Sequence, residues 1–445
     1  MTVTRPPKPT LNAARTPHAK ARQGGARPAP AGPTQELVVK VSHVGTQGDG
    51  VVLEPRIYVP LGLPGETLKV LRQGDYAEIL EVMEPSADRI APSCQHYGDC
   101  GGCAFQHWSP EPYMAWKTQL VRQLLGREGI ETEFLDPFAA VPGSRRRLAL
   151  HARRGTGGAE LGFKARRSWR LVGISDCTVA DPRLVAALPA LRRLALPFLE
   201  HPKSAPTLHV TLTRTGLDID VTGVEAKSGG LSMDARIKAT QIAGECDFAR
   251  VTLAGEIIFQ ARQPMVSFGP ATVALPAGSF LQADPAAEAA MAKMAVEALA
   301  GSKGIADLFC GAGAFTFNLA QIAPVYAADT SAPAVKALSS AIASASGLKP
   351  ITAEARDLDR RPVLAMEMKK IDSVVFDPPR AGAEIQCGEI GRSKVSRAVA
   401  ISCNPVTFAR DAKILVEAGF TLKWVRPVDQ FLWSPHIEVV ALFER

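Results

Sequence analysis

Three patterns of hydrophobic and polar positions follow one another along the 445-residue chain. Between residues 36 and 88, short apolar runs interrupted by glycine and proline predict five β-strands, typical of a small barrel of the oligonucleotide-binding type. A helix-like stretch from Tyr113 to Glu128 is followed by strand-like alternation from Arg145 to about Phe268. These patterns predict a small β-barrel and a central region that mixes helix and strand.

From Gly304 the pattern changes to apolar runs of buried-strand length that alternate with helical stretches. These runs are residues 305–309, 325–328, 371–376 and 398–402. The alternation predicts an α/β domain with a parallel sheet between two layers of helices, and residues 421–425 and 437–443 predict a closing antiparallel hairpin. We therefore expect four parts: a tail (1–35), the barrel (36–88), a central α+β domain (89–265) and the α/β domain (266–445).

Composition changes this picture mainly at the N-terminus. The chain has 51 Lys and Arg against 44 Asp and Glu, a net charge of +7, and the proline-rich first 35 residues contain six of the basic residues and no acidic one. We expect this tail to be disordered, with a weak electrostatic contact to RNA as the alternative. The tail has no apolar signal core, and the uncharged stretch 308–328 contains glycine, asparagine and proline. We therefore expect a cytoplasmic protein without membrane contact.

Basic residues also gather in the central region, although the 410 residues after the tail are together close to neutral, with 45 Lys and Arg against 44 Asp and Glu. They are Arg145, Arg146, Arg147, Arg153, Arg154, Lys164, Arg166, Arg167 and Arg170, with Trp169 among them and Glu160 as the acidic residue nearby. A solvated surface is the alternative, but this clustering favours contact with a nucleic-acid backbone.

A glycine-containing loop follows the first predicted strand of the α/β domain. Gly311 and Gly313 allow close approach of a ligand, and Asp329 at the end of the next strand can accept hydrogen bonds from ribose hydroxyls. The third glycine of a dinucleotide fingerprint is replaced by Thr316. Together with the motifs below, this favours S-adenosylmethionine over NAD.

Two further motifs follow the next predicted strands. Asp377 stands before Pro378 and Pro379, which hold the loop rigid, and Cys403 lies within the run Ser402 to Pro405. A cysteine at a strand end beside the cofactor crevice is placed to be a nucleophile, the alternative being a small buried thiol. We assign that alternative to the other isolated cysteines, namely Cys246, Cys310 and Cys387.

These motifs, with residues 279–284 and 436–438, resemble the S-adenosylmethionine-dependent RNA uracil-C5 methyltransferases. The resemblance implies a class I methyltransferase (Rossmann-like) fold for the α/β domain. It also implies that Cys403 adds to C6 of uracil and that Glu438 removes the C5 proton after methyl transfer. The residues that it implies for holding the uracil or the cofactor are Gln282, Phe309, Gly311, Gly313, Asp329, Asp357 and Asp377. Related enzymes often have asparagine at the position of Asp284 and glutamate at that of Asp329.

A separate group of cysteines predicts a metal site. Cys94, Cys100 and Cys103 are close together, and Cys177 is the candidate for a fourth ligand. Spacing alone does not separate zinc from an iron–sulfur cluster. The resemblance, strongest for the ribosomal-RNA branch, implies a structural 4Fe–4S cluster on these four residues. It also implies that the barrel is an OB-like TRAM module.

The sequence thus predicts a monomeric enzyme that methylates C5 of a uridine in structured RNA, with 23S rRNA as the expected substrate. Methylation of tRNA is one alternative. A non-catalytic RNA-binding or assembly module is another, and the presence of Cys403, Glu438 and Asp377 argues against it. A third is an iron–sulfur enzyme with radical chemistry, against which the fourth thiolate, Cys177, argues.

Overall fold

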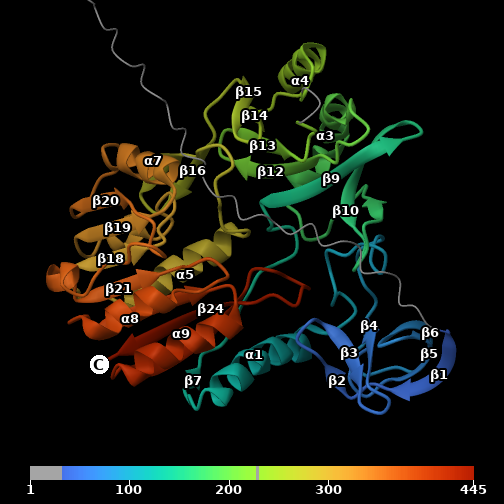
Figure 1. The fold of residues 1–445 in the computed structure, drawn as a ribbon, viewed down its shortest axis with the longest axis horizontal. Coiled ribbons are helices and arrows are strands. Elements are labelled where there is room, and N and C mark those ends of the chain that lie inside the picture. Colours follow the sequence, from blue (N-terminus) through green and yellow to red (C-terminus); the bar gives the residue numbers. More distant parts are fainter. Residues whose placement is uncertain (1–32, 227–229) are drawn as a thin grey trace, which may run out of the picture.

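The computed structural model describes residues 33–226 and 230–445, so residues 1–32 of the expected tail lie outside the described residues. Within these two ranges the strands form three large sheets and one small hairpin (Figure 1). None of the helices in these two ranges is long and apolar enough to cross a membrane.

The first sheet has the strand order β1-β5-β6-β4-β3-β2. Its strands are β1 (Gln35–Lys40), β2 (His43–Val44), β3 (Asp49–Val52), β4 (Ile57–Pro60), β5 (Thr67–Gln73) and β6 (Tyr76–Glu84). The edge strands β1 and β2 follow each other in the chain, and the link between them bonds to both neighbours: the Val41 amide donates to Glu66 and the Ser42 amide to Val51. The small sheet therefore closes on itself around Ile57, Val59 and Leu68.

The second sheet has the order β11-β10-β9-β12-β13-β14-β15. Its strands are β9 (Arg147–Gly155), β10 (Gly158–Lys164), β11 (Leu171–Gly173), β12 (Thr207–Thr213), β13 (Gly216–Thr222), β14 (Arg250–Leu253) and β15 (Glu256–Gln260). The helical segments α2 (Pro182–Ala186), α3 (Leu188–Ala195), η1 (Pro197–Leu199) and α4 (Met233–Glu245) accompany this central sheet. Because alternate strand residues point to one face, Leu150, Leu208 and Ile219 pack with Leu191 of α3 and Ala239 of α4.

The third sheet has the order β20-β19-β18-β21-β22-β24-β23-β7, with β8 also paired to β23. Its strands are β7 (Glu133–Phe134), β8 (Phe138–Ala139), β18 (Ile305–Leu308), β19 (Val325–Asp329), β20 (Ile351–Ala355), β21 (Ser373–Phe376), β22 (Arg397–Ser402), β23 (Thr421–Asp429) and β24 (Glu438–Glu444). The five strands from β20 to β22 are parallel, and β24 is antiparallel to β22. This arrangement agrees with the predicted parallel sheet and closing hairpin.

Helices cover both faces of the third sheet, which separates two hydrophobic clusters. The helical segments are α1 (Pro110–Arg127), α5 (Pro285–Ala298), α6 (Thr316–Leu319), α7 (Ala332–Ile342), η2 (Glu367–Lys370), α8 (Glu384–Arg392) and α9 (Pro405–Glu417), and β16 (Met265–Phe268) pairs with β17 (Ala271–Ala274). The helix α1 and the strands β7 and β8 join this layer although they precede the central sheet in sequence, because Val121 and Leu125 pack into its core. The carboxyl ends of β18, β21 and β22 thus come together next to Glu438 at the start of β24.

Candidate active site

Cys403 occupies the turn between β22 and α9. The next residue, Asn404, caps α9 by accepting a hydrogen bond from the Val406 amide (3.2 Å), and Pro405 takes the first helical turn. The Asn404 side chain also donates to the Arg380 carbonyl at 2.8 Å. The cysteine motif and the Asp377–Arg380 loop are therefore fixed to each other, as their positions at neighbouring strand ends predict.

Four polar side chains form a hydrogen-bonded chain beside this turn. Gln282 donates to Asp377 at 3.0 Å, and Gln430 donates both to Gln282 at 2.7 Å and to Glu438 at 2.6 Å. Gln282, Gln430 and Glu438 are buried. This hydrogen-bonded chain brings together Gln282, Asp377 and Glu438, three of the residues predicted from the sequence. The sequence does not single out Gln430, because a glutamine after a strand carries no recognisable motif.

The electrostatics of the site disfavour negative charge. Burial raises the pKa of Asp377 well above its ordinary value, and the nearby Glu438 adds to this shift. Burial also raises the pKa of Glu438, against the Gln430 hydrogen bond and the charge of Arg380. For Cys403, burial and then the charges of Glu438 and Asp377 raise the pKa to about 11, whereas Arg380 lowers it. A buried carboxyl group with a raised pKa beside a thiol is suited to proton transfer.

The predicted cofactor loop begins directly after β18. Phe309, Gly311 and Gly313 have positive φ angles of 64°, 54° and 99°. A Cβ atom built on Gly311 would meet no atom within 4 Å, so the loop borders open space there. Asp329 accepts from the Gly311 amide at 2.9 Å and from the Ser331 amide at 2.7 Å, which ties the glycine loop to the end of β19.

The helix after this loop is short. The helix α6 has only four residues, so no long helix dipole begins at the end of the loop. Thr316, which replaces the third glycine, is buried and donates to Asp307 at 2.5 Å. Burial raises the pKa of Asp307 to about 7, and its Oδ1 atom has no hydrogen-bond partner among the described residues.

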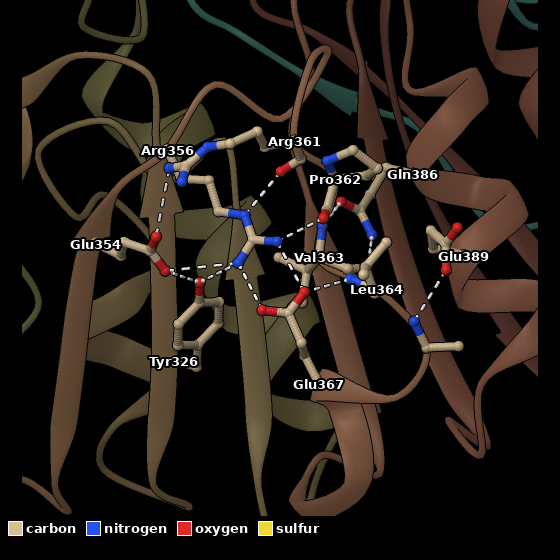
Figure 2. Close-up of polar contacts among 11 residues, drawn as sticks. Tyr326, Glu354, Arg356, Arg361, Pro362, Val363, Leu364, Glu367, Gln386 and Glu389 are labelled. Carbon is tan, nitrogen blue, oxygen red and sulfur yellow. Dashed lines mark hydrogen bonds and ion pairs between the residues drawn. The ribbon is translucent and has the colours of Figure 1, made fainter.

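Asp357 lies two residues after the end of β20. Its carboxylate accepts from the amides of Asp359 at 3.1 Å and Arg360 at 3.2 Å, which forms a tight turn. The preceding residue, Arg356, anchors this turn from the other side through Glu367 at 2.8 Å and the carbonyls of residues 361 and 362 (Figure 2). The structure thus places Asp357 on the same sheet edge as Asp329 and Asp377.

The four cysteines of the predicted metal site line one cavity of about 390 Å³. Tyr97 and Phe163 line it with them, and Arg380 and His436 border it as well, so it adjoins the strand-end site. Throughout the described part of the chain, no three His, Cys, Asp or Glu side chains converge closely enough to hold one metal ion. Four thiolates are the donor set both of a structural zinc site and of an iron–sulfur cluster.

The basic central segment is less exposed than the sequence suggests. Arg146 is buried, pairs with Glu288 at 2.7 Å and donates to the Gln282 carbonyl at 3.0 Å. The expectation that Arg146 contacts RNA is therefore wrong, because its guanidinium group is buried and forms an ion pair within the protein. Arg166 and Arg167 pair with Asp49 of the small sheet. Trp169 and Lys164 remain at the surface, stacked with 3.7 Å between the Lys164 nitrogen and the ring centre.

Asp284 helps to position Gln282. Its side chain caps α5 by accepting from the amides of Ala286 at 2.7 Å and Ala287 at 3.2 Å, and it also bonds to Ser144. The residue that departs from the family pattern therefore has a structural function here, at the start of the helix that follows Gln282.

Comparisons with known proteins relate this chain to RNA methyltransferases. Residues 270–445 match the family described as tRNA (Uracil-5-)-methyltransferase. An uncharacterized RNA methyltransferase of Caulobacter vibrioides is 63% identical over 91% of this chain and 99% of its own length. The 23S rRNA (uracil(1939)-C(5))-methyltransferase RlmD of Halomonas elongata is 31% identical over 92% of this chain and 89% of its own length.

Among solved structures, the Pyrococcus abyssi tRNA (uracil-54, C5)-methyltransferase in complex with S-adenosyl-L-homocysteine has a similar fold. It superposes with a TM-score of 0.70 at 21% identity, over 91% of this chain and 99% of that chain. This likeness confirms the predicted α/β fold with its additional N-terminal sheets.

Proposed function

Because the chain belongs to the RNA uracil-C5 methyltransferase family and is an S-adenosylmethionine-dependent enzyme, we propose that Cys403 and Glu438 perform its chemistry, on ribosomal RNA. The observation that carries the proposal is the hydrogen-bonded chain from Asp377 through Gln282 and Gln430 to Glu438, next to the Cys403 turn.

C5 of uracil is a poor nucleophile, so the reaction needs covalent activation. Cys403 adds to C6 as a thiolate and forms a carbon–sulfur bond, which moves the electron pair of the C5–C6 double bond toward O4. S-adenosylmethionine supplies the methyl group that C5 takes up. Glu438 then accepts the C5 proton, the double bond re-forms, and the Cys403 thiolate leaves.

The remaining site residues hold the two reactants. Gln282 and Asp377 hold the uracil or the amino acid end of the cofactor. Phe309, Gly311 and Gly313 line the cofactor, Asp329 bonds the ribose and Asp357 meets the adenine side. The target base reaches this pocket only when it is single-stranded or flipped out of a helix.

The cysteine mutant and the glutamate mutant should fail in different ways. We expect Cys403→Ala to bind S-adenosylmethionine but neither methylate RNA nor attach to it. We expect Glu438→Gln to transfer the methyl group and then accumulate a protein–RNA adduct that survives denaturation. The adduct is measured by denaturing gel, also with wild-type protein and RNA that contains 5-fluorouridine, because fluorine replaces the proton to be removed.

Cys246→Ala is the matched control, since this partly exposed thiol lies in the central region after α4 and should leave methylation unchanged. Normal methylation by Cys403→Ala would contradict the role of Cys403 as the nucleophile. Normal turnover of Glu438→Gln without an adduct would assign the base to another group.

The choice of ribosomal over transfer RNA is supported by the Halomonas elongata relative, which is named for 23S rRNA and resembles this chain over nearly its whole length. The test is the 5-methyluridine content of separated 23S rRNA and tRNA from a deletion strain, measured by mass spectrometry. Loss from 23S rRNA is expected, and loss from tRNA alone would contradict the assignment.

We further propose that Cys94, Cys100, Cys103 and Cys177 hold a 4Fe–4S cluster. The cluster would be structural, because this methylation transfers no electron. Protein purified without oxygen should be brown and contain about four irons per chain. A colourless protein with one tightly bound zinc would contradict the cluster.

We assign residues 36–88 to a TRAM-type RNA-binding module, 89–265 to the cluster-binding central domain and 266–445 to the methyltransferase domain. The closed small sheet and the surface pair Lys164 and Trp169 support this division of roles. We expect the protein to act as a monomer.

A further inference from the structure

The loop between β23 and β24 has a site residue at each end. Gln430 directly follows Asp429, the last residue of β23, and Glu438 is the first residue of β24. The two side chains are joined by the 2.6 Å hydrogen bond from Gln430 to Glu438. The orientation of the proposed base therefore depends on how the two ends of this loop are held.

One side chain from a distant helix binds both ends. The Lys117 ammonium donates to the Asp429 carboxylate at 2.6 Å, to the His436 carbonyl at 2.6 Å and to the Phe431 carbonyl at 3.4 Å. Asp429 and Phe431 belong to the start of the loop, and His436 lies two residues before Glu438. The three donors of the ammonium are thus matched by three acceptors at the two ends of the loop.

The pair of Lys117 and Asp429 is enclosed within the protein. Both side chains are 0% exposed, and the Tyr113 hydroxyl donates to the second carboxylate oxygen of Asp429 at 2.7 Å. Lys117 lies on α1, between the small sheet and the third sheet (Figure 1), in a buried row with Tyr113, Val121 and Leu125.

A buried ion pair is a poor way to stabilise a helix, because removing two charges from water costs much of what their attraction returns. Apolar residues would pack the same row of α1 against the loop. They could not bind two backbone carbonyls and a carboxylate at once, which is what fixes the loop ends relative to each other. The contacts therefore favour a function in positioning.

We propose that Lys117 and Asp429 are positioning residues for removal of the C5 proton: they clamp the loop so that Gln430 holds Glu438 at the reacting base. This inference rests on the proposed function of Glu438. Gln430 also bonds Gln282, so the clamp reaches both Glu438 and Gln282 through this side chain. Glu438 additionally lies at a clamped end of the loop, two residues after His436, so removal of the C5 proton is the step that we expect to be slowed most.

The test is the double variant Lys117→Met/Asp429→Asn, which removes both charges and leaves no unpaired buried charge. We expect it to bind S-adenosylmethionine normally and to add Cys403 to RNA, but to accumulate the covalent adduct. A shift in the position of the base should lower kcat by about tenfold or more, with KM for RNA almost unchanged. A purely structural pair would lower thermal stability without enriching the adduct.

The matched control is the buried pair of Arg250 and Asp218 in the central sheet, which are 2.7 Å apart. Arg250→Met/Asp218→Asn removes an equivalent pair away from the loop and should lower stability without adduct. Wild-type turnover by the clamp variant, or equal adduct in the control, would overturn the proposal. Failure of wild-type protein to be trapped by 5-fluorouridine RNA would instead refute the covalent mechanism.

A milder variant gives a second reading if the double variant does not fold. Tyr113→Phe removes only the hydroxyl that bonds Asp429 and keeps the ion pair. We expect it to fold and to show a smaller, measurable increase in adduct. A Tyr113→Phe protein with the wild-type amount of adduct and wild-type kcat would overturn the clamp.

Discussion

At the scale of single residues, the environment of Cys403 opposes formation of the thiolate that the reaction needs. Burial, then Glu438 and Asp377, raises the pKa of the thiol to about 11, and Arg380 is the charge that lowers it. The free enzyme therefore keeps Cys403 protonated at neutral pH, which protects it from oxidation and alkylation. Burial raises the pKa of Glu438 to about 7, so this carboxyl group can exchange a proton near neutrality. Burial and the nearby Glu438 raise the pKa of Asp377 well above its ordinary value, which disfavours a second negative charge in the site.

This electrostatic arrangement predicts how Cys403 reacts with iodoacetamide in the absence of RNA. Only the thiolate reacts, and well below the pKa its fraction rises about tenfold for each pH unit. We expect the alkylation rate to keep rising toward a pKa of about 11. Arg380→Met removes the charge that favours the thiolate and should slow alkylation at pH 8 to 9, whereas Glu438→Gln should speed it.

The rates are measured by mass spectrometry of the peptide that contains Cys403, with Cys246 as an internal reference. A midpoint near the ordinary cysteine value of about 8.5 would contradict the opposing environment. The same conclusion would follow if Arg380→Met had no effect.

At the scale of secondary-structure elements, the start of α5 determines where Gln282 lies. Asp284 caps this helix and Pro285 begins it, so the direction of the backbone just before the helix is fixed. Arg146 adds a second constraint, because it binds both Glu288 of α5 and the Gln282 carbonyl. Central-sheet and α/β residues thus jointly fix one member of the hydrogen-bonded chain.

The cap of α5 gives a prediction about stability. Asp284→Ala removes two capping hydrogen bonds and should destabilise the protein by about 1–2 kcal/mol, the usual cost of a lost N-cap. Asp284→Asn keeps an acceptor and should cost much less. The thermal midpoint of each variant measures the effect, with Ser331→Ala at the cap of α7 as a comparison of the same kind.

Equal destabilisation by alanine and asparagine at this position would show that the carboxylate charge, rather than the cap, matters. We also expect Asp284→Ala to lower the rate of methylation, since Gln282 lies two residues before the cap.

At the scale of the whole molecule, the small sheet is attached to the central sheet through Asp49. This buried carboxylate on β3 binds Arg166 at 2.8 Å and also binds Arg167, both in the turn after β10. Arg166 also donates to the Gln47 and Gly48 carbonyls at 3.1 Å. The neighbouring residue, Ala165, pairs with Cys100, so the attachment adjoins the cysteine segment.

This attachment predicts the effect of Asp49→Ala. Arg166 and Arg167 would lose their shared acceptor, and the turn that carries them should open to trypsin. We expect trypsin to cleave faster after these two residues, as measured by mass spectrometry. We also expect methylation of long structured RNA to fall more than methylation of short oligonucleotides. Glu36→Ala, which removes an exposed ion pair with Lys69 within the small sheet, is the control. An unchanged cleavage rate would show that other contacts hold the small sheet.

The sequence by itself determined the elements and the chemistry-bearing positions of this protein. Buried parallel strands need consecutive apolar residues, so β18, β19, β21 and β22 are visible as runs, and the motifs at their ends mark Asp377 and Cys403. Strand-end position also predicts that such residues meet at one edge, because parallel strands end on the same side.

Only the tertiary structure decided which distant side chains complete the site. Gln430 meets Gln282 across 148 residues, and Lys117 meets Asp429 across 312. A lysine in a helix and an arginine in a basic run resemble surface residues, so Lys117 and Arg146 could not be recognised as buried. The packing of α1 and α5 against the sheets determines which partners these two residues meet. Local hydrophobic periodicity does not encode that packing, because the packing depends on contacts between segments far apart in the chain.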